Sequence, residues 1–268
     1  MKPFFPLPAA ISLFSFLSCA TAQPSGKTAP VVMLDYYFNN EYKKNAAGEM
    51  VRYHYTWEDK ASSGFSMWGE RFRSAGAITD SLAVAPTPEH LARASVYIIV
   101  DADTEKETPK PNYIQSADIE AITAWVKKGG MLVLLANDSG NAEFTHFNQL
   151  ATKFGIRFNE DRYHLVINNQ YEQGAFTVPP GHPLLPNAKK IFLKELSTLT
   201  VQNPAHSVFT DDGHVIMAVA DYGKGKVLAI GDPWVYNEYI DGKKLPAEYE
   251  NPQAATDLAN WLLKQVRK

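Results

Sequence analysis

Several polar side chains that could bind a ligand or react follow short apolar runs of the chain. The runs Val31–Leu34, Val96–Val100, Met131–Ala136 and Val227–Ile230 have the continuous apolar character of buried strands. Because ligands of open α/β sheets bind beyond the carboxyl ends of the strands, we predict a binding site where these ends meet. The polar residues at the ends of the apolar runs are Asp35, Asp101, Asp103, Asn137, Asp138, Ser139 and Asp232.

Two aromatic segments, 36–57 and 234–239, flank these strand ends in the expected fold. Flat apolar ring faces beside planar hydrogen-bond acceptors suit a saccharide, so we predict an oligosaccharide-binding site. The alternative is that the rings close the edges of the sheet and the carboxylates cap helices. The predicted hydroxyl-binding and stacking set is Asp35, Asn40, Trp57, Asp101, Asn137, Asp138, Asp232, Trp234 and Asn237.

Paired carboxylates would also allow a glycoside hydrolase, which needs two carboxyl groups about 5 Å or about 6.5–9.5 Å apart. Among these candidates, we take Asp138 and Asp232 as the alternative catalytic pair. The sequence does not give their separation. The candidate carboxylates are Asp35, Asp101, Asp138, Glu143, Asp232 and Glu238.

Other segments match the patterns of known catalytic and cofactor-binding motifs only in part. Ser139 lies at a strand-to-helix turn near His146, but the turn lacks the glycines of a nucleophile elbow. The segment from Asp101 begins like a calcium loop, yet Lys106 stands where that loop needs glycine and Asn112 where it needs glutamate. The run 223–226 lacks the spacing of a phosphate-binding loop. We therefore expect neither a metal nor a cofactor.

The N-terminus has the features of a secretory signal peptide, residues 1–22. Lys2 precedes an uncharged, mostly apolar stretch, and Ala20-Thr21-Ala22 offers a small-x-small cleavage site. We expect export to the periplasm or cell surface, with a lipid anchor at Cys19 as the alternative because the preceding residues form an imperfect lipobox. A polar leader, residues 23–30, would follow.

Composition narrows the classes of protein further. The net charge of −3 over 268 residues does not favour a nucleic-acid partner, and no run is long and apolar enough for a transmembrane segment. Cys19 is the one cysteine, so cleavage after Ala22 leaves a chain without a thiol nucleophile. The 45% of hydrophobic residues is ample for a packed core.

Strands and helices alternate through residues 31–155. Apolar spacing predicts helices over 63–75, 116–128 and 143–154. We expect Ser116 to cap the helix over 116–128, and Thr87 to cap a short helix that begins directly after it. After residue 156 the pattern favours strands: 157–177 and 191–201 are expected to be extended, and 222–225 joins a hairpin. A closing helix spans 252–266. We predict one α/β domain, residues 31–268, with a mostly parallel sheet, helices on both faces and an antiparallel extension in the second half.

Five segments resemble a glutamine-amidotransferase-like domain that occurs attached to bacterial unsaturated rhamnogalacturonyl hydrolases. The resemblance implies a flavodoxin-like fold and a role in the breakdown of rhamnogalacturonan, a pectin. The chain departs from both families, because it lacks the helical catalytic barrel of the hydrolase and the amidotransferase cysteine. The segments are 31–40, 55–60, 96–104, 125–139 and 222–237, of which 231–239 is the most specific.

These observations favour an exported accessory protein of plant cell-wall saccharide breakdown. Its expected partner is an oligosaccharide or a glycosidase chain, and whether it is itself an enzyme stays open. A purely structural module that binds a protein partner is a third interpretation. An acidic sugar would need a local cation, for which Arg52, Arg71 and Arg162 are the candidates.

Overall fold

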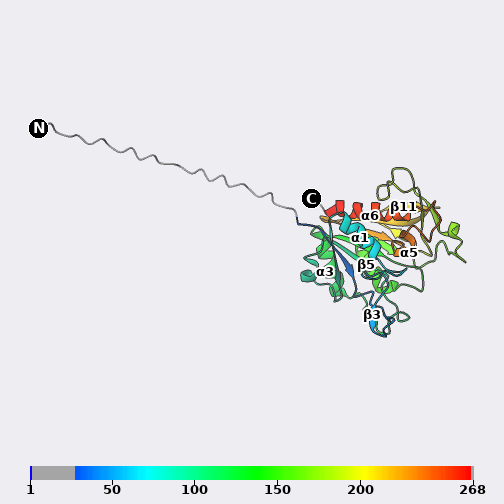
Figure 1. Ribbon diagram of the computed structural model, residues 1–268, viewed down its shortest axis with the longest axis horizontal. Helices are drawn as coiled ribbons and strands as arrows, with labels where there is room; N and C mark the ends of the chain where they lie inside the picture. The colour runs from blue at the N-terminus through cyan, green and yellow to red at the C-terminus, as the bar shows by residue number, and fades with distance from the viewer. Residues whose placement is uncertain (2–27, 267–268) are drawn as a thin grey trace.

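The computed structural model describes Met1 and residues 28–266 (Figure 1). The predicted cleavage site, Cys19 and residues 23–27 of the polar leader lie outside the described residues. In the described part of the chain, no helix is both long and apolar enough to cross a membrane, as the sequence predicts.

The central sheet has nine strands, of which five are parallel. Numbered by their order along the chain, these five lie in the spatial order 2-1-3-4-5, the flavodoxin-like order. This confirms the predicted fold class. From one edge inward the strands are β4 (Ile78–Leu82), β1 (Val31–Asp35), β5 (Val96–Val100), β6 (Met131–Leu135) and β13 (Gly225–Ile230).

Antiparallel strands continue the sheet beyond β13. β12 (His214–Tyr222) pairs with β13 through a tight turn at Gly223, which has a φ of +62° that glycine adopts without strain. The hairpin and the antiparallel extension predicted for the second half are thus confirmed. The remaining strands are β11 (Ala205–Asp211), β10 (Leu199–Val201) and β7 (Ile156–Phe158).

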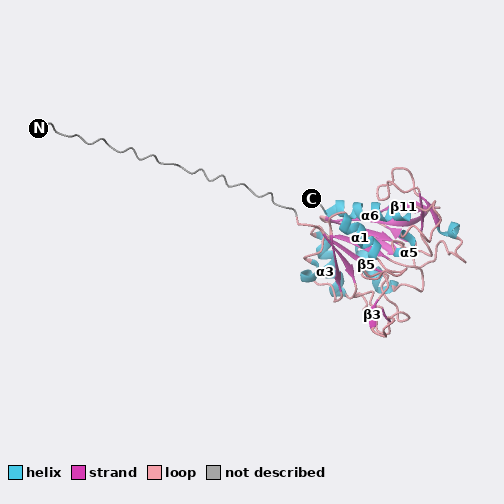
Figure 2. Ribbon diagram, viewed as in Figure 1, coloured by secondary structure: helices cyan, strands magenta, loops and turns pink. Residues whose placement is uncertain are grey.

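Helices cover both faces of the sheet (Figure 2). α1 (Ser66–Ser74) and α6 (Asn251–Val266) pack together on one face. The other face carries α2 (Pro88–Leu91), α3 (Ser116–Lys127) and α4 (Phe144–Ala151), which continues as the 3₁₀ turn η1 (Thr152–Phe154). A short α5 (Asn237–Ile240) follows β13.

The strand sequences explain why both faces are covered. Alternate side chains of one strand belong to opposite apolar clusters: Leu34 of β1 packs with α1 and α6, whereas its neighbour Met33 packs with α3. All five residues of β5 and of β6 are buried. A strand buried on both faces needs apolar residues throughout, so these strands appear in the sequence as unbroken apolar runs.

Two small ribbons lie outside the central sheet. β2 (Tyr42–Lys44) and β3 (Met50–Arg52) form an antiparallel hairpin that projects from the body of the molecule (Figure 1); we call residues 42–52 the arm. The second ribbon pairs β8 (Ala175–Thr177) with β9 (Lys190–Phe192), and the 3₁₀ turn η2 (Tyr171–Gly174) precedes it.

Some local predictions need correction. Ser116 does not cap α3: the cap residue is Gln115, whose backbone N–H donates to Asp118 at 2.9 Å. The stretch 157–177 is mostly irregular, because strand structure occurs there only at its two ends, in β7 and β8. Thr87 caps α2 as predicted, accepting from the backbone N–H of His90 at 3.2 Å.

Candidate functional site

The topological switch point of the sheet lies between β1 and β5. From β1 the chain passes to β4 on one side, and then to β5 on the other side. Loops that leave two neighbouring parallel strands in opposite directions open a crevice at their carboxyl ends. Asp35 ends β1 and Asp101 follows β5, so two of the predicted site residues lie at the switch point.

Asp35 is buried and held by its surroundings. Its carboxylate accepts from the Tyr97 hydroxyl at 2.5 Å and from the backbone N–H groups of Phe38, at 2.6 Å, and Tyr37, at 3.1 Å. Burial raises its pKa from 3.8 to about 7, although these donors oppose the shift. Asp35 therefore organises the turn that leaves β1, in line with the alternative in which the carboxylates cap local structure.

Asp101 is 4% exposed, and its φ of +42° is uncommon for a residue with a side chain. Its Oδ2 accepts from the Asn137 amide at 3.1 Å, while Oδ1 has no hydrogen-bond partner among the described residues. Burial, reinforced by the charge of Glu107, raises the pKa of Asp101 to about 8, although the Asn137 and Tyr55 side chains oppose the shift. Burial therefore favours the protonated form of this carboxyl.

Asp103 lies beside Asp101 and is also buried. Its Oδ2 accepts from the backbone N–H of Asn40 at 2.8 Å and from the Thr108 hydroxyl at 2.6 Å. Its Oδ1 has no partner in the part of the chain that the structure describes, and burial raises its pKa to about 6. Asp103 thus positions Asn40, a predicted site residue, at the same strand ends.

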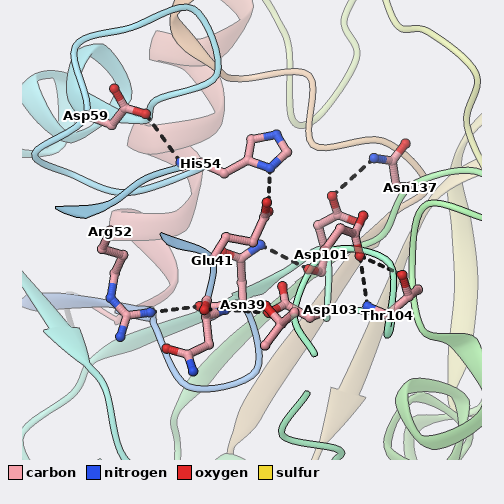
Figure 3. Close-up of polar contacts among 12 residues, drawn as sticks. Asn39, Glu41, Arg52, His54, Asp59, Asp101, Asp103, Thr104 and Asn137 are labelled. Atoms are coloured by element: carbon pink, nitrogen blue, oxygen red, sulfur yellow. Dashed lines mark hydrogen bonds and ion pairs between the residues drawn. The ribbon is translucent and has the colours of Figure 1, made fainter. Parts of the chain in front are cut away.

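A pair that the sequence analysis did not select, Glu41 and His54, faces the same region (Figure 3). Nδ1 of His54 lies 2.5 Å from Oε1 of Glu41, and Glu41 is only 4% exposed. Hydrogen bonding to His54 lowers the pKa of Glu41 in spite of its burial, and Glu41 raises the pKa of His54. The two residues flank the arm on either side, so pairing of its two strands brings them together.

No periodic pattern marks Glu41 or His54 in the sequence. Both belong to an aromatic segment without helical or strand periodicity, and contact depends on the hairpin between them. His54 and Tyr55 have φ values of +61° and +52°. For Tyr55, a bulky residue, this is a true outlier, which local sequence preferences do not anticipate.

Asp138 and Asp232, the alternative catalytic pair, lie further along the same edge. Asp138 is fully buried and accepts from Arg162 and from the Asn141 amide. Asp232 accepts from the backbone N–H of Lys194 at 2.7 Å. Burial raises the pKa of Asp232 to about 8, and the charge of Asp138 adds to the shift, so the two carboxyls interact electrostatically.

The predicted ring-stacking residues do not present their rings to solvent. Trp57 is 7% exposed and packs on Trp68 and Phe72, while Trp234 is fully buried in the core. Burial of these indoles favours the alternative that the aromatic side chains close the sheet. Stacking on a bound sugar by either ring therefore does not fit this structure.

Asn237 also has a structural place. Its Oδ1 accepts from the backbone N–H of Met67 at 3.0 Å and from the Ser66 hydroxyl at 3.3 Å, in the first turn of α1. Its amide donates to the backbone carbonyls of Asp59, at 3.1 Å, and Ala61, at 2.8 Å. All the side-chain atoms that could bind a hydroxyl are thus used within the protein.

Two of the three candidate cations are used within the fold. Arg52 donates to the backbone carbonyl of Tyr36 at 2.7 Å and stacks against the rings of Tyr36 and Tyr42. Arg71 donates to backbone carbonyls of three helices, those of Met67 in α1, Ile240 in α5 and Pro252 in α6. Arg162 is 47% exposed at the strand ends but is paired with Asp138.

Serine and metal chemistry gain no support in the described ranges. Glu143 caps α4 and lies 3.1 Å from Nδ1 of His146, so the predicted local base already has a partner. Among residues 28–266, no three His, Cys, Asp or Glu side chains are placed to hold a metal ion.

Together, the sheet order and the strand-end polar residues define a flavodoxin-like α/β protein with a candidate site at its switch point. Residues 108–242, half of the chain, match the family described as a domain of unknown function, DUF4350, and the chain belongs to this family. No curated protein matches the chain.

Solved structures share the fold at low sequence identity. The mmIFT52 N-terminal domain is 17% identical with a TM-score of 0.62, over 87% of this chain and 96% of that one. Cytoplasmic protein STM1381 from Salmonella typhimurium LT2 is 15% identical with a TM-score of 0.58, over 89% of this chain and 100% of that protein. A β-galactosidase from Rahnella sp. R3 is 16% identical with a TM-score of 0.54, over 88% of this chain but 31% of the enzyme. At such identities the similarity establishes the fold alone.

Proposed function

We propose that this protein binds an oligosaccharide at the switch point, as an exported accessory protein of plant cell-wall saccharide breakdown. One observation carries the proposal. Asp101 and Asp103 are both buried, yet each keeps one carboxyl oxygen without a partner among the described residues. An unsatisfied buried polar atom costs about 1–3 kcal/mol, so a ligand that satisfies these oxygens gains binding energy there.

The chemistry of the surrounding side chains suits hydroxyl groups. Three partly exposed residues adjoin the two buried carboxyls: Asn137 donates to Asp101, the Asn40 backbone donates to Asp103, and His54 lowers the pKa of Asp101. Their side chains together offer both donors and acceptors. A sugar hydroxyl can donate and accept at the same time, so it matches such a mixed set.

The context of plant-wall breakdown rests on the resemblance to domains attached to rhamnogalacturonyl hydrolases. The fold shared with one region of a β-galactosidase is compatible with such an attachment. A glycosidase chain is accordingly the protein partner we propose.

Calorimetric titration of the chain from Gln23 onward with rhamnogalacturonan oligosaccharides, saturated and unsaturated, tests the proposal. We expect Asn40→Ala and Asn137→Ala each to weaken binding about tenfold, because each removes a hydrogen bond worth about 1 kcal/mol or more. Asn260→Ala, on an exposed position of α6, is the matched control. Wild-type affinity in both site variants would contradict the proposal.

The alternative function is hydrolysis by Asp138 and Asp232. The observation in its favour is their electrostatic interaction, since catalytic pairs combine carboxyls of different environments. It predicts that Asp138→Asn or Asp232→Asn abolishes turnover while the fold survives. Unchanged turnover in both variants would reject this pair.

A further inference from the structure

The Glu41–His54 pair has the arrangement of a catalytic base held by a carboxylate. Glu41 engages Nδ1 of His54 at 2.5 Å, whereas Nε2 makes no hydrogen bond to any described residue. The histidine side chain is 25% exposed, so Nε2 can meet a ligand or a water molecule. A carboxylate on Nδ1 fixes the tautomer in which neutral Nε2 accepts a proton.

Asp101 provides an acid in the same region. The Asn137 amide donates to Oδ2, so the proton of the neutral carboxyl belongs on Oδ1, the oxygen without a described partner. Figure 3 shows Asp101 and His54 on neighbouring loops, with Glu41 below the imidazole. Each of the two influences the other: the charge of Asp101 raises the pKa of His54, and His54 lowers that of Asp101.

We infer that the bound saccharide is also hydrolysed, with Asp101 as general acid and His54, held by Glu41, as general base. The inference rests on the proposed function, because the reacting saccharide occupies the proposed binding site. It assigns the chemistry to a different pair from Asp138 and Asp232.

The step balances with water as the one co-reactant. Oδ1–H of Asp101 protonates the glycosidic oxygen as its bond to the anomeric carbon breaks. A water molecule forms the new carbon–oxygen bond and gives its proton to Nε2 of His54. The proton then returns from His54 to Asp101 through solvent. Because no covalent intermediate forms, the anomeric configuration inverts.

The free oxygen of the acid is buried, so a substrate reaches it only after a local rearrangement at the strand ends. Asn39 donates to the backbone carbonyl of Asp101 at 3.1 Å and thereby ties the segment that leads to Glu41 to the backbone of the acid.

The neighbours of the two groups set the pH dependence of this step. Glu41, Asp101 and Glu107 raise the pKa of His54. Burial and the charge of Glu107 raise the pKa of Asp101 to about 8, and the Asn137 and Tyr55 side chains oppose this shift. The step needs neutral His54 and protonated Asp101, so the rate falls at low pH, where His54 is protonated, and at high pH, where Asp101 loses its proton.

The test combines binding and turnover on one set of oligosaccharides. We expect wild-type protein to release shorter products with inverted configuration, seen by NMR. His54→Gln and Asp101→Asn should each lower kcat at least 100-fold with affinity within threefold. Asp221→Asn, at an exposed position of β12, is the control and should keep the wild-type turnover. In addition, Glu41→Gln should lower the pKa of His54 in an NMR titration of the protein alone.

The outcomes separate the two proposals. Binding without products, or products that persist in both His54→Gln and Asp101→Asn, would overturn the hydrolysis and leave saccharide binding intact. Absence of binding by wild-type protein would reject the proposed function and the hydrolysis with it. A His54 pKa that does not change in Glu41→Gln would overturn the assignment of His54, held by Glu41, as the base even without a substrate.

Discussion

Three carboxyl groups at the strand ends share one physical state. Asp35, Asp101 and Asp232 are each at most 4% exposed, and burial raises their pKa values to about 7, 8 and 8. None of them forms an ion pair among the described residues that would offset the cost of burying a charge. The carboxyl end of the sheet is therefore rich in protons at neutral pH, which is unusual for a cluster of aspartates.

This state makes stability depend on pH, and Asp232 gives the clearest test. Its pKa is about 8 in the folded protein against 3.8 ordinarily, so between these values the folded form binds a proton that the unfolded form has released. Stability falls as pH rises through this range, by at most about 1.4 kcal/mol per pH unit from this group. Above about pH 8 the loss levels off.

Asp232→Asn removes the titration and keeps an acceptor for the Lys194 N–H. We expect urea unfolding at pH 5 to 9 to show a shallower loss of stability than in wild type. The exposed Asp221→Asn is the control and should keep the wild-type slope. An equal slope in Asp232→Asn and wild type would mean that Asp232 is ionised in the folded protein throughout.

Single residues were predictable where their position along a strand decided their place. Asp35 and Asp101 follow apolar runs directly, so the sequence located them at the strand ends. The burial of Trp57 and Trp234 was not predictable, since an indole near a strand end is equally compatible with a core and a binding surface. The Glu41–His54 contact depends on hairpin geometry that no local signal encodes.

At the scale of elements, helix α1 depends on a side chain from far along the chain. No side chain of its own cap residue, Phe65, can satisfy the first-turn N–H groups, and Asn237 does so instead. Asn237 also donates to the loop before α1, and thereby joins α1 to the segment after β13. One residue predicted to bind hydroxyls therefore stabilises the junction of three segments.

Asn237→Ala should lower the free energy of unfolding by about 2–4 kcal/mol, because it removes a helix cap and the hydrogen bonds to the backbone carbonyls of Asp59 and Ala61. Saccharide affinity measured below the unfolding transition should stay at the wild-type value. Asn260→Ala serves as the control for stability. A variant with wild-type stability and weakened binding would restore Asn237 to the ligand site.

The elements themselves followed from periodicity more reliably than the segments between them. The closing helix, the hairpin after β12 and the helix capped by Thr87 carry strong local signals. The stretch 157–177 carries aromatic and β-branched residues but is a strand only at its ends, because side chains in between pack on Phe192 and on the segment 239–249 outside the central sheet. Propensity alone does not separate these two cases.

At the scale of the whole molecule, alternation of strands and helices predicted a parallel sheet covered on both faces. It did not predict which strands are neighbours, and the switch point depends on that order: β1 lies between β4 and β5. A different order would have placed Asp35 and Asp101 apart. The site is thus a property of the topology, which no short segment of the sequence contains.

The whole chain also includes the predicted signal peptide, and its processing is directly measurable. Lys2, the uncharged apolar stretch and Ala20-Thr21-Ala22 predict cleavage after Ala22, which leaves a chain that begins at Gln23 and contains no cysteine. We expect intact-mass analysis of the protein exported by a bacterial host to match that chain, with no reaction toward a thiol reagent.

Replacing Ala20 and Ala22 by bulky residues should block release, because signal peptidase accepts small side chains at these positions. A mass that shows a lipid on Cys19 would instead establish anchoring at the membrane surface, and with it a site that meets only saccharides that reach that surface.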